Sequence, residues 1–282
     1  MSGPAEFVIR TMKRSDLDVA IEWASREGWN PGLNDAETFY HADPSGFFAG
    51  FISGIPVACI SSVKYGSSFG FLGLYIVKPE YRGRGFGIKI WEKALEYLGD
   101  RNIGLDGVVA RQTDYEKYGF KFAYRNLRFA GSFTCPTGSK NLVDLKNLET
   151  SKIAEYDIQV FPARRDNFVS RWVKQKGSKA LGYLADDRLA GYGVLRPCVM
   201  GFKIGPLFAD SRRIAQELLS GLASHTGKDR IFIDIPEPNQ QALDLVKRNL
   251  MEKIFETARM YNKSTPDLPL DRIYGATTLE LG

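Results

Sequence analysis

The sequence predicts an α/β (α+β) protein in which one fold is used twice in tandem, each copy being a twisted mixed sheet flanked by helices. Three observations predict this class. Short β-rich runs alternate with amphipathic stretches of helical period along the chain. The order hairpin, strand, helix, strand, helix of the first half recurs in the second half. The 282 residues exceed what one hydrophobic core usually organises, so two domains are expected.

The first half is expected to open with a strand and a helix. FVIRTM predicts the strand, and SDLDVAIEWASREG predicts a helix with Ser15 or Asp16 as its cap and Gly28 at its end. A loop and a short helix are expected over WNPGLNDAETFY. The β-rich runs FFAGFI and VACISSV are separated by SGIP, a turn signal, and predict an antiparallel hairpin.

A strand at 69–77, FGFLGLYIV, leads into the glycine-rich stretch YRGRGFG. From Gly87 the apolar period lengthens from two to about 3.6, which predicts a helix that Gly99 caps. Its expected apolar stripe is Ile88, Trp91, Leu95 and Leu98. The half is then completed by a strand around 103–109, a brief helix around 113–120 and a strand at 121–131.

A linker is expected between Thr134 and Glu155, where CPTGSKN precedes residues of no regular apolar period. The predicted domains are therefore 1–138 and 150–282. The elements expected in the second are a hairpin at 179–197 with an Asp-Asp turn, a strand at 203–209, a helix at 211–226 capped by Ser211, a buried strand at 230–236 and a helix at 239–250.

The composition of the chain limits the kinds of partner and site that are expected. The net charge is +5; residues 1–138 hold 16 basic and 15 acidic side chains and residues 139–282 hold 22 and 18, so neither half carries a concentrated basic field and a nucleic-acid surface is not expected. Three widely spaced cysteines and two histidines support neither a disulfide framework nor a metal site. The uncharged stretch 44–63 contains the SGIP turn, so it favours a hairpin and no membrane span. The N-terminus resembles no secretory signal, and the expected compartment is the cytoplasm.

The stretch that carries chemistry is RxxGxG, formed by Arg82, Gly85 and Gly87 between a strand and a helix. Such a turn aims several backbone N–H groups at one point, at the positive end of a helix dipole, and glycines let an anion approach closely. A phosphate or pyrophosphate is the natural ligand. A plain turn and a piece of an RNA-binding arginine-glycine tract are the alternatives. The dinucleotide and NTP patterns GxGxxG and GxxxxGK[ST] are absent.

The run LYIVKPEYRGRGFGIKIWEKAL, followed by YEKYGFKF, resembles the GCN5-related N-acetyltransferase (GNAT) superfamily over residues 7–131. GLDGVVARQTDYEKYGF, GPLFAD and the closing YGATTLELG resemble its tandem-domain YitH/HolE type, in which a second acetyltransferase-like domain follows the first. The resemblance implies an acyltransferase that uses acetyl-CoA as co-substrate and no metal. It implies direct transfer of the acetyl group to a small-molecule or peptide amine, of unknown identity, within a ternary complex.

The resemblance also implies the residues that bind acetyl-CoA. Backbone amides of the turn would hold the pyrophosphate, and the turn consists of Arg82, Gly83, Arg84, Gly85, Phe86 and Gly87. The end of the preceding strand would pair with the pantetheine arm, and one of its N–H groups would polarise the thioester carbonyl. That strand end is Tyr75, Ile76 and Val77.

Tyr115 stands where the superfamily has a tyrosine that acts as general acid. A phenol is protonated at pH 7 and can donate to the leaving thiolate. The alternative is that Tyr115 packs against its helix and only hydrogen-bonds the sulfur, and Tyr118 is expected in the core. No Asp or Glu lies on the strand 69–77, so the general base is unassigned. The candidates are Asp106, His41, a water chain or an amine that binds already neutral. The asparagine that is common in the family ahead of this tyrosine is missing, and the chain reads ARQTDY there.

In the second half the equivalent turn reads FADSRRIA, without glycine, and Val246 stands where the tyrosine would be. A degenerate domain that does not bind CoA is therefore expected. Its expected use is to close the acceptor pocket as an intrachain pseudo-dimer, in a monomer or a homodimer, with Tyr183, Tyr192 or Glu237 as candidate contacts. The alternative for the whole chain is a catalytically weak CoA-binding sensor or interaction protein.

Overall fold

The computed structural model describes residues 6–132 and 139–282. The strands and helices up to residue 132 are β1 (Phe7–Thr11), α1 (Arg14–Arg26), α2 (Asp35–Ala42), β2 (Phe47–Ile52), β3 (Ile55–Tyr65), β4 (Phe69–Val77), α3 (Phe86–Leu98), β5 (Asn102–Val108), α4 (Gln112–Glu116) and β6 (Lys121–Gly131). Those from residue 139 onward are β7 (Leu142–Asp144), α5 (Thr150–Asp157), α6 (Asp166–Val173), β8 (Lys179–Ala185), β9 (Arg188–Pro197), β10 (Phe202–Ala209), α7 (Arg212–Ala223), β11 (Ile231–Pro236), α8 (Gln240–Arg248), β12 (Glu252–Tyr261) and β13 (Ile273–Gly275).

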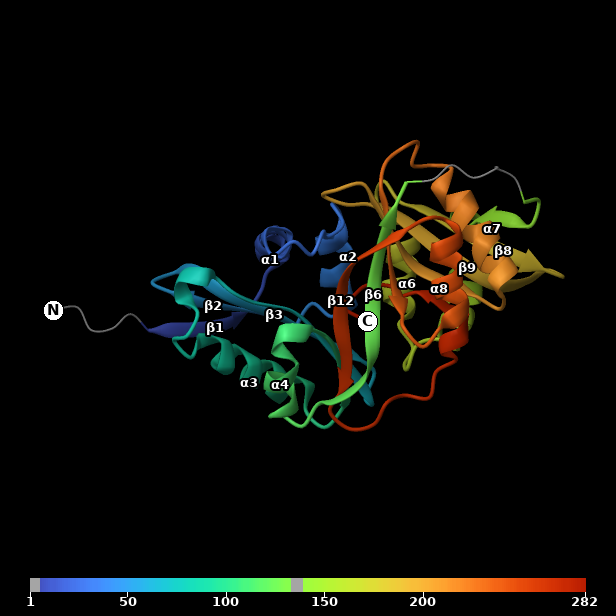
Figure 1. The fold of residues 1–282 in the computed structure, drawn as a ribbon. Helices are drawn as coiled ribbons and strands as arrows, with labels where there is room; N and C mark the ends of the chain where they lie inside the picture. The colour runs from blue at the N-terminus through green and yellow to red at the C-terminus, as the bar shows by residue number, and fades with distance from the viewer. Residues whose placement is uncertain (1–5, 133–138) are drawn as a thin grey trace.

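The strands of both halves form one continuous mixed sheet in the described residues. Its order is β1-β2-β3-β4-β5-β12-β6-β11-β10-β9-β8-β7, with β13 paired to β10. The two halves exchange a strand at the centre of this sheet: β12, from the second half, lies between β5 and β6 of the first, and β6 pairs in turn with β11. Figure 1 shows β12 beside β6. Each half therefore depends on the other for the pairing of its last strand.

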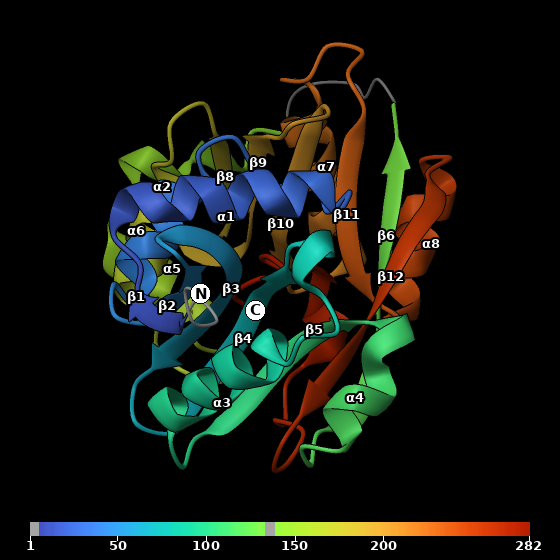
Figure 2. The same ribbon diagram turned by 90° about the vertical axis from the view of Figure 1, so that its left-hand side faces the viewer.

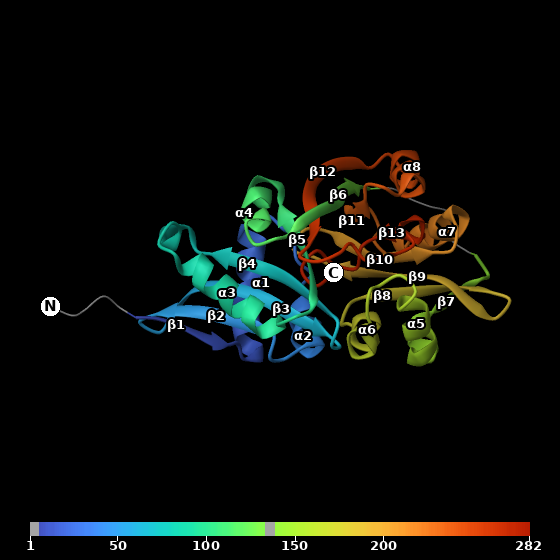
Figure 3. The same ribbon diagram turned by 90° about the horizontal axis from the view of Figure 1, so that it is seen from below.

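Helices cover both faces of the sheet. On one face, α1 and α2 of the first half and α5 and α6 of the second share a single apolar core, which includes Phe39 and Trp172 (Figure 3). On the other face, α3 packs on the first half, where Ile90 and Leu98 are fully buried. Figure 2 shows α1 and α3 on opposite sides of the strands of the first half. The helices α7 and α8 bury the opposite face in the second half.

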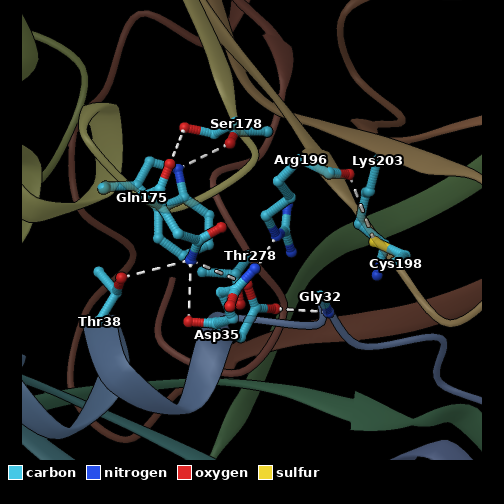
Figure 4. A network of polar contacts seen from close by, with 12 residues as sticks. Gly32, Asp35, Thr38, Gln175, Ser178, Arg196, Cys198, Lys203 and Thr278 are labelled. Atoms are coloured by element: carbon cyan, nitrogen blue, oxygen red, sulfur yellow. Dashed lines mark hydrogen bonds and ion pairs between the residues drawn. The ribbon is translucent and has the colours of Figure 1, made fainter. Parts of the chain in front are cut away.

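A polar network fastens α2 to the second half. Asp35 accepts hydrogen bonds from Arg196 Nε of β9 at 2.9 Å, from Gln175 Nε2 at 3.3 Å and from the Gly32 N–H at 2.8 Å (Figure 4). Gln175 donates also to Thr38 Oγ1 at 3.3 Å. Asp35 and Arg196 are buried, and a buried charge is stable only when it is paired and hydrogen-bonded. The network thus fixes the angle between the halves.

The structure confirms most of the expected elements and corrects four details. The first helix begins at Arg14, so Ser15 and Asp16 lie in its first turn, where the Asp16 carboxylate accepts the Lys13 N–H at 2.9 Å. Ile88 is 52% exposed, because the helix turns Ile90 and Ala94 into the core in its place. The expected linker contains β7 and most of α5, and Cys135 lies outside the described residues.

The fourth detail is a set of elements that the sequence analysis did not anticipate. These are the helices α5 and α6, which precede the hairpin β8–β9, and the strand β12. With α5 and α6 added, each half carries a pair of helices on the same face of the sheet. The duplication is therefore more complete than the sequence pattern indicated.

Candidate active site

A notch opens in the sheet between β4 and β5. The two strands pair in parallel from Phe69 and Asn102 as far as Leu72 and Leu105. Beyond this point β4 gains one residue relative to β3, and Leu74 takes a left-handed φ of 46°. A bulge of this kind bends a strand away from its neighbour. β5 continues beside β12 as far as Val108, so the edge of β4 beyond Leu72 is left without a β5 partner in the described chain.

A cavity fills this notch. The first half contributes Gly73, Leu74 and Tyr75 of β4, the end of β5, Trp91 of α3 and Tyr115 of α4. The second half contributes Phe255 and Thr257 of β12 and, from the segment after β13, Leu279 and Glu280. The strand exchange at the centre of the sheet is what brings β12 to the cavity. A buried, mostly apolar cavity with a few convergent polar groups is the usual form of a ligand site.

The glycine-rich turn lies between the end of β4 and the start of α3. Gly83 and Gly85 have φ angles of 76° and 80°, values that favour glycine. In the described chain the N–H groups of Gly83, Arg84 and Gly85 donate no backbone hydrogen bond, and the first N–H groups of a helix have no acceptor within the helix. These donors converge at the positive end of α3, which is the arrangement that binds phosphate.

The Arg82 side chain contacts the strand and the helix end that flank this turn. Its Nε donates to the Val77 carbonyl at 2.8 Å, and its Nη2 pairs with Glu27, the residue that follows α1, at 2.5 Å. These contacts tie the end of β4 to the start of the turn. The Arg84 guanidinium lies 5.5 Å from the centre of the Tyr81 ring and is exposed, so its charge faces solvent beside the open N–H groups.

The end of β4, residues 75–77, which is expected to pair with the pantetheine arm, lies next to the cavity and next to the glycine-rich turn. Tyr75 lines the cavity, Ile76 is buried beneath it and Val77 accepts the Arg82 hydrogen bond. The Tyr75 hydroxyl would be only 2.6 Å from a Cβ at Gly87, so a glycine is required where the strand meets the helix. The turn, the edge of β4 and the cavity thus form one continuous path.

Tyr115 points toward this path. A Cβ at Gly107 would collide with the Tyr115 ring, so the glycine of β5 makes room for it. The ring also packs 5.5 Å from Trp91, which packs against Tyr75 at 5.4 Å. Burial, with a smaller contribution from Tyr75, raises the pKa of Tyr115 to about 12. Tyr118 was expected in the core, but it is 40% exposed and only its ring face contacts Trp91.

The two side chains named as candidate bases are differently placed. His41 is bonded to Glu37 on α2 and does not line the cavity. Asp106 does line it, but both carboxylate oxygens are held by Arg259 of β12, at 2.9 and 2.6 Å, and Asn126 donates at 2.7 Å. Burial raises the pKa of Asp106, and the Arg259 guanidinium opposes that rise. Asp106 is therefore positioned as the partner of a buried arginine.

The equivalent turn of the second half has a different chemistry. Ser211 caps α7 by accepting the Ile214 N–H at 3.4 Å. Asp210 stands immediately before this cap and accepts hydrogen bonds from Arg188 at 3.0 Å, Arg272 at 2.6 Å and the Tyr156 hydroxyl at 2.9 Å. A carboxylate at this position disfavours a phosphate by like charge. The candidate contacts Tyr183, Tyr192 and Glu237 do not line the cavity at Tyr115.

Sequence reasoning missed the contribution of the second half to the cavity. Phe255 and Thr257 lie on a strand that was not predicted, and Glu280 lies in the closing segment YGATTLELG. The only signal for that segment was its resemblance to the tandem proteins. Its residues are buried although it contains a glutamate and four threonine or glycine positions in a short run, a pattern that gives no apolar period.

Two family profiles match the chain. Residues 16–120 match the acetyltransferase (GNAT) family, and residues 153–275 match an acetyltransferase (GNAT) domain. Together the two matches cover most of both halves. The chain belongs to the GNAT superfamily. This GNAT protein is a tandem-domain acyltransferase, and the enzymes of its family use acyl-CoA co-substrates.

Relatives of similar length support the same assignment for this GNAT protein. Holothin acyltransferase of Pseudoalteromonas sp. (strain SANK 73390) is 29% identical over 280 residues, covering 96% of this chain and 94% of its own. The uncharacterised N-acetyltransferase YitH of Bacillus subtilis (strain 168) is 23% identical and covers 93% and 94%. A solved structure from Pyrococcus horikoshii, a candidate acetyltransferase, shares the fold with a TM-score of 0.83 and 24% identity, covering 98% of this chain and 96% of its own. Across the described residues, no helix is long and apolar enough to cross a membrane.

Proposed function

We propose that the protein transfers the acetyl group of acetyl-CoA directly to an amine, within a ternary complex of enzyme, acetyl-CoA and acceptor. One observation carries this proposal. The turn with open N–H groups, Gly83 to Gly87, adjoins the unpaired edge of β4, which leads into the cavity lined by Tyr115. This path has the order that an acyl-CoA needs: phosphate, pantetheine arm, thioester.

In the proposed complex, backbone amides of the turn 82–87 hold the pyrophosphate, and the dipole of α3 adds to their attraction. The pantetheine amides pair with the main chain of Tyr75, Ile76 and Val77. A backbone N–H at the bulge of β4 donates to the thioester carbonyl and stabilises the oxyanion as it forms. Loss of one such donor in other enzymes costs about 2.7–4 kcal/mol of transition-state stabilisation.

Tyr115 is proposed as the general acid. The leaving group of the reaction is the CoA thiolate, which needs a proton. A phenol whose pKa is about 12 is protonated throughout the neutral range and therefore carries the proton that the sulfur takes. The Tyr115 ring lines the cavity and packs against Trp91, with the ring centres 5.5 Å apart, which supports a fixed position for this donor.

The second domain, residues 150–282, is proposed to wall the acceptor pocket and to bind no CoA. Phe255, Thr257 and Leu279 support the first role, because they line the cavity opposite β4. Asp210 at the start of α7 supports the second. The acceptor is proposed to be a small-molecule or peptide amine. The relative from Pseudoalteromonas is named holothin acyltransferase, which agrees with an acyl acceptor as the second substrate.

Two measurements on the purified protein test the proposal. Calorimetry with acetyl-CoA and with CoA measures binding, and a thiol reagent follows CoA release from acetyl-CoA with spermidine, lysine, glucosamine and benzylamine. Micromolar binding together with amine-dependent CoA release is expected. Binding without any release would favour a CoA-binding sensor, and absence of binding would overturn the assignment of the turn.

A further inference from the structure

A second carboxylate lies in the cavity that holds Tyr115. Glu280 lines this cavity together with Gly73, Leu74 and Tyr115, and it is 5% exposed. It comes from the segment 276–282, which leaves β13 and passes back across the first half; Figure 3 shows the end of this segment between the two halves. Glu280 thus lines the cavity beside the bulge of β4 although it belongs to the opposite half of the chain.

The segment is held over β4 by its main chain. Ser61 Oγ donates to the Glu280 carbonyl at 3.4 Å, the Tyr65 hydroxyl donates to the Leu281 carbonyl at 2.9 Å, and Arg165 Nη1 donates to the Gly282 carbonyl at 3.1 Å. A Cβ at Gly73 would collide with the Glu280 carbonyl. The glycine at the bulge therefore permits the close approach that places Glu280 beside the edge of β4.

The pairing of the buried charges singles out Glu280. Four acidic side chains of the interior each have an arginine partner, in the pairs Asp35–Arg196, Asp106–Arg259, Asp157–Arg165 and Asp234–Arg128. Glu280 has no ion-pair partner among the described residues, and its carboxylate accepts a hydrogen bond from the Thr278 hydroxyl. A hydroxyl partner leaves lone pairs of the carboxylate free to accept a proton.

The groups that face Glu280 come from several elements. Three cations lie close enough for the negative charge of Glu280 to favour their protonated forms. They are Arg128 of β6, Arg196 of β9 and Lys203 of β10. Asp106 of β5 and Tyr115 of α4 share its cavity. Both Arg128 and Arg196 are already bonded to aspartates, and Lys203 reaches only the Trp29 carbonyl, at 3.4 Å. Among the described residues, none of these cations is hydrogen-bonded to the Glu280 carboxylate, whose partner is the Thr278 hydroxyl.

We propose that Glu280 is the general base of the reaction and takes the proton of the attacking amine. This inference rests on the proposed function. The neutral amine nitrogen forms a bond to the thioester carbon, its N–H proton passes to a Glu280 carboxylate oxygen, and the C–S bond breaks. The electron pair stays on sulfur, which takes the Tyr115 hydroxyl proton. Glu280 then releases its proton to solvent and Tyr115 regains one, so that charge and atoms balance.

The test compares Glu280→Gln, Glu280→Asp and the wild type in CoA release with the four amines named above, over a range of pH. Glu280→Gln keeps the size of the side chain and removes the base, so kcat/KM is expected to fall by about 10²-fold or more. The pH profile of Glu280→Gln is expected to differ in shape from that of the wild type. Glu280→Asp is expected to restore part of the rate.

Binding and stability controls separate this role from a structural one. The Kd for acetyl-CoA and the melting temperature of Glu280→Gln are expected to match the wild type, and Glu116→Gln, an exposed glutamate next to Tyr115 in the chain, serves as the matched control. An active wild type with an equally active Glu280→Gln, or an unchanged pH profile, would overturn the role of Glu280 alone. A wild type that binds acetyl-CoA and releases no CoA with any amine would overturn the proposed function, and the role of Glu280 with it.

Discussion

Arg128 and Asp234 join the two halves of the chain through parallel hydrogen bonds in the interior. Arg128 Nε and Nη2 donate to the Asp234 carboxylate at 2.7 and 2.9 Å, across directly paired positions of β6 and β11. Arg128 Nη1 donates to the Trp29 carbonyl at 2.7 Å. Both side chains of the ion pair are 3% exposed. One arginine therefore holds two strands from different halves and the loop after α1, beside the cavity that it also lines.

Asp234→Asn should destabilise the protein strongly, because it leaves the buried Arg128 charge without a counter-ion. Breaking a buried pair of this kind costs about 3–5 kcal/mol. Urea denaturation followed by circular dichroism measures the free energy of unfolding. Glu256→Gln is the control, since the Lys253–Glu256 pair is exposed and should contribute less than about 1 kcal/mol. A loss below 1 kcal/mol in Asp234→Asn would show that the pair is dispensable.

The same carboxyl predicts a pH dependence of stability. Burial alone would raise the pKa of Asp234, but the ion pair with Arg128 outweighs burial and lowers it. A group whose pKa is lower in the folded state contributes stability above its unfolded pKa and loses it as the pH falls through the folded value. The wild type should therefore lose stability below about pH 4, and Asp234→Asn should lose less over the same interval. Parallel pH curves for the two proteins would contradict this assignment.

Gly85→Val should abolish acetyl-CoA binding and leave the fold intact. Gly85 has a φ of 80°, where a β-branched residue is strained by about 1–2 kcal/mol, and its side chain would stand among the N–H groups of the turn. The matched control is Gly54→Val, in the β2–β3 turn. Gly54 has a φ of 79°, and both positions have open space around a new Cβ. Calorimetry should show lost binding for Gly85→Val alone. If both variants bind acetyl-CoA equally well, the assignment of the phosphate to this turn is wrong.

Tyr115→Phe should lower kcat by about 10²-fold while the Kd for acetyl-CoA stays the same, because it removes a proton donor and keeps the ring. The pKa of about 12 also implies that the wild type shows no alkaline loss of activity from this group up to about pH 10, since the phenol remains protonated there. Tyr118→Phe, on the exposed side of Trp91, is the control and should change kcat less than twofold. Equal rates in the two variants would leave Tyr115 with a packing role.

The elements that the sequence predicted well are those that local chemistry determines. The turn predicted from SGIP lies at Ser53 and Gly54 between β2 and β3, Ser211 caps α7, and Asp186 and Asp187 take the left-handed φ angles of a tight hairpin turn. The glycine-rich turn 82–87 belongs to the same class, because its glycines and its place between a strand and a helix are visible within a few residues.

What sequence reasoning missed depends on contacts between distant residues. EKIFETARMY becomes the central strand β12 because β5 and β6 each offer it an edge to pair with. These partners are far away in the chain: Arg259 lies opposite Asp106 of β5 and opposite Tyr124 of β6. The proposed base, Glu280, was missed for the same reason, because it approaches β4 from a segment more than 200 residues away in the chain, with its main chain against Gly73. No periodicity records such a pairing.

The exchanged strands predict that neither half folds alone. In residues 1–138, β6 would lose both of its neighbours, β11 and β12, and β5 would lose its partner from Gly104 to Val108. Unpaired strand edges and an exposed apolar core favour aggregation. Expressed separately, residues 1–138 and 139–282 should be insoluble or bind a hydrophobic dye, whereas co-expression should yield a stable heterodimer. Calorimetry of the whole chain should show one unfolding transition. A soluble fragment 1–138 with a cooperative melt would show that the first half carries enough pairing of its own, and the two halves would then be independent domains that merely share a sheet.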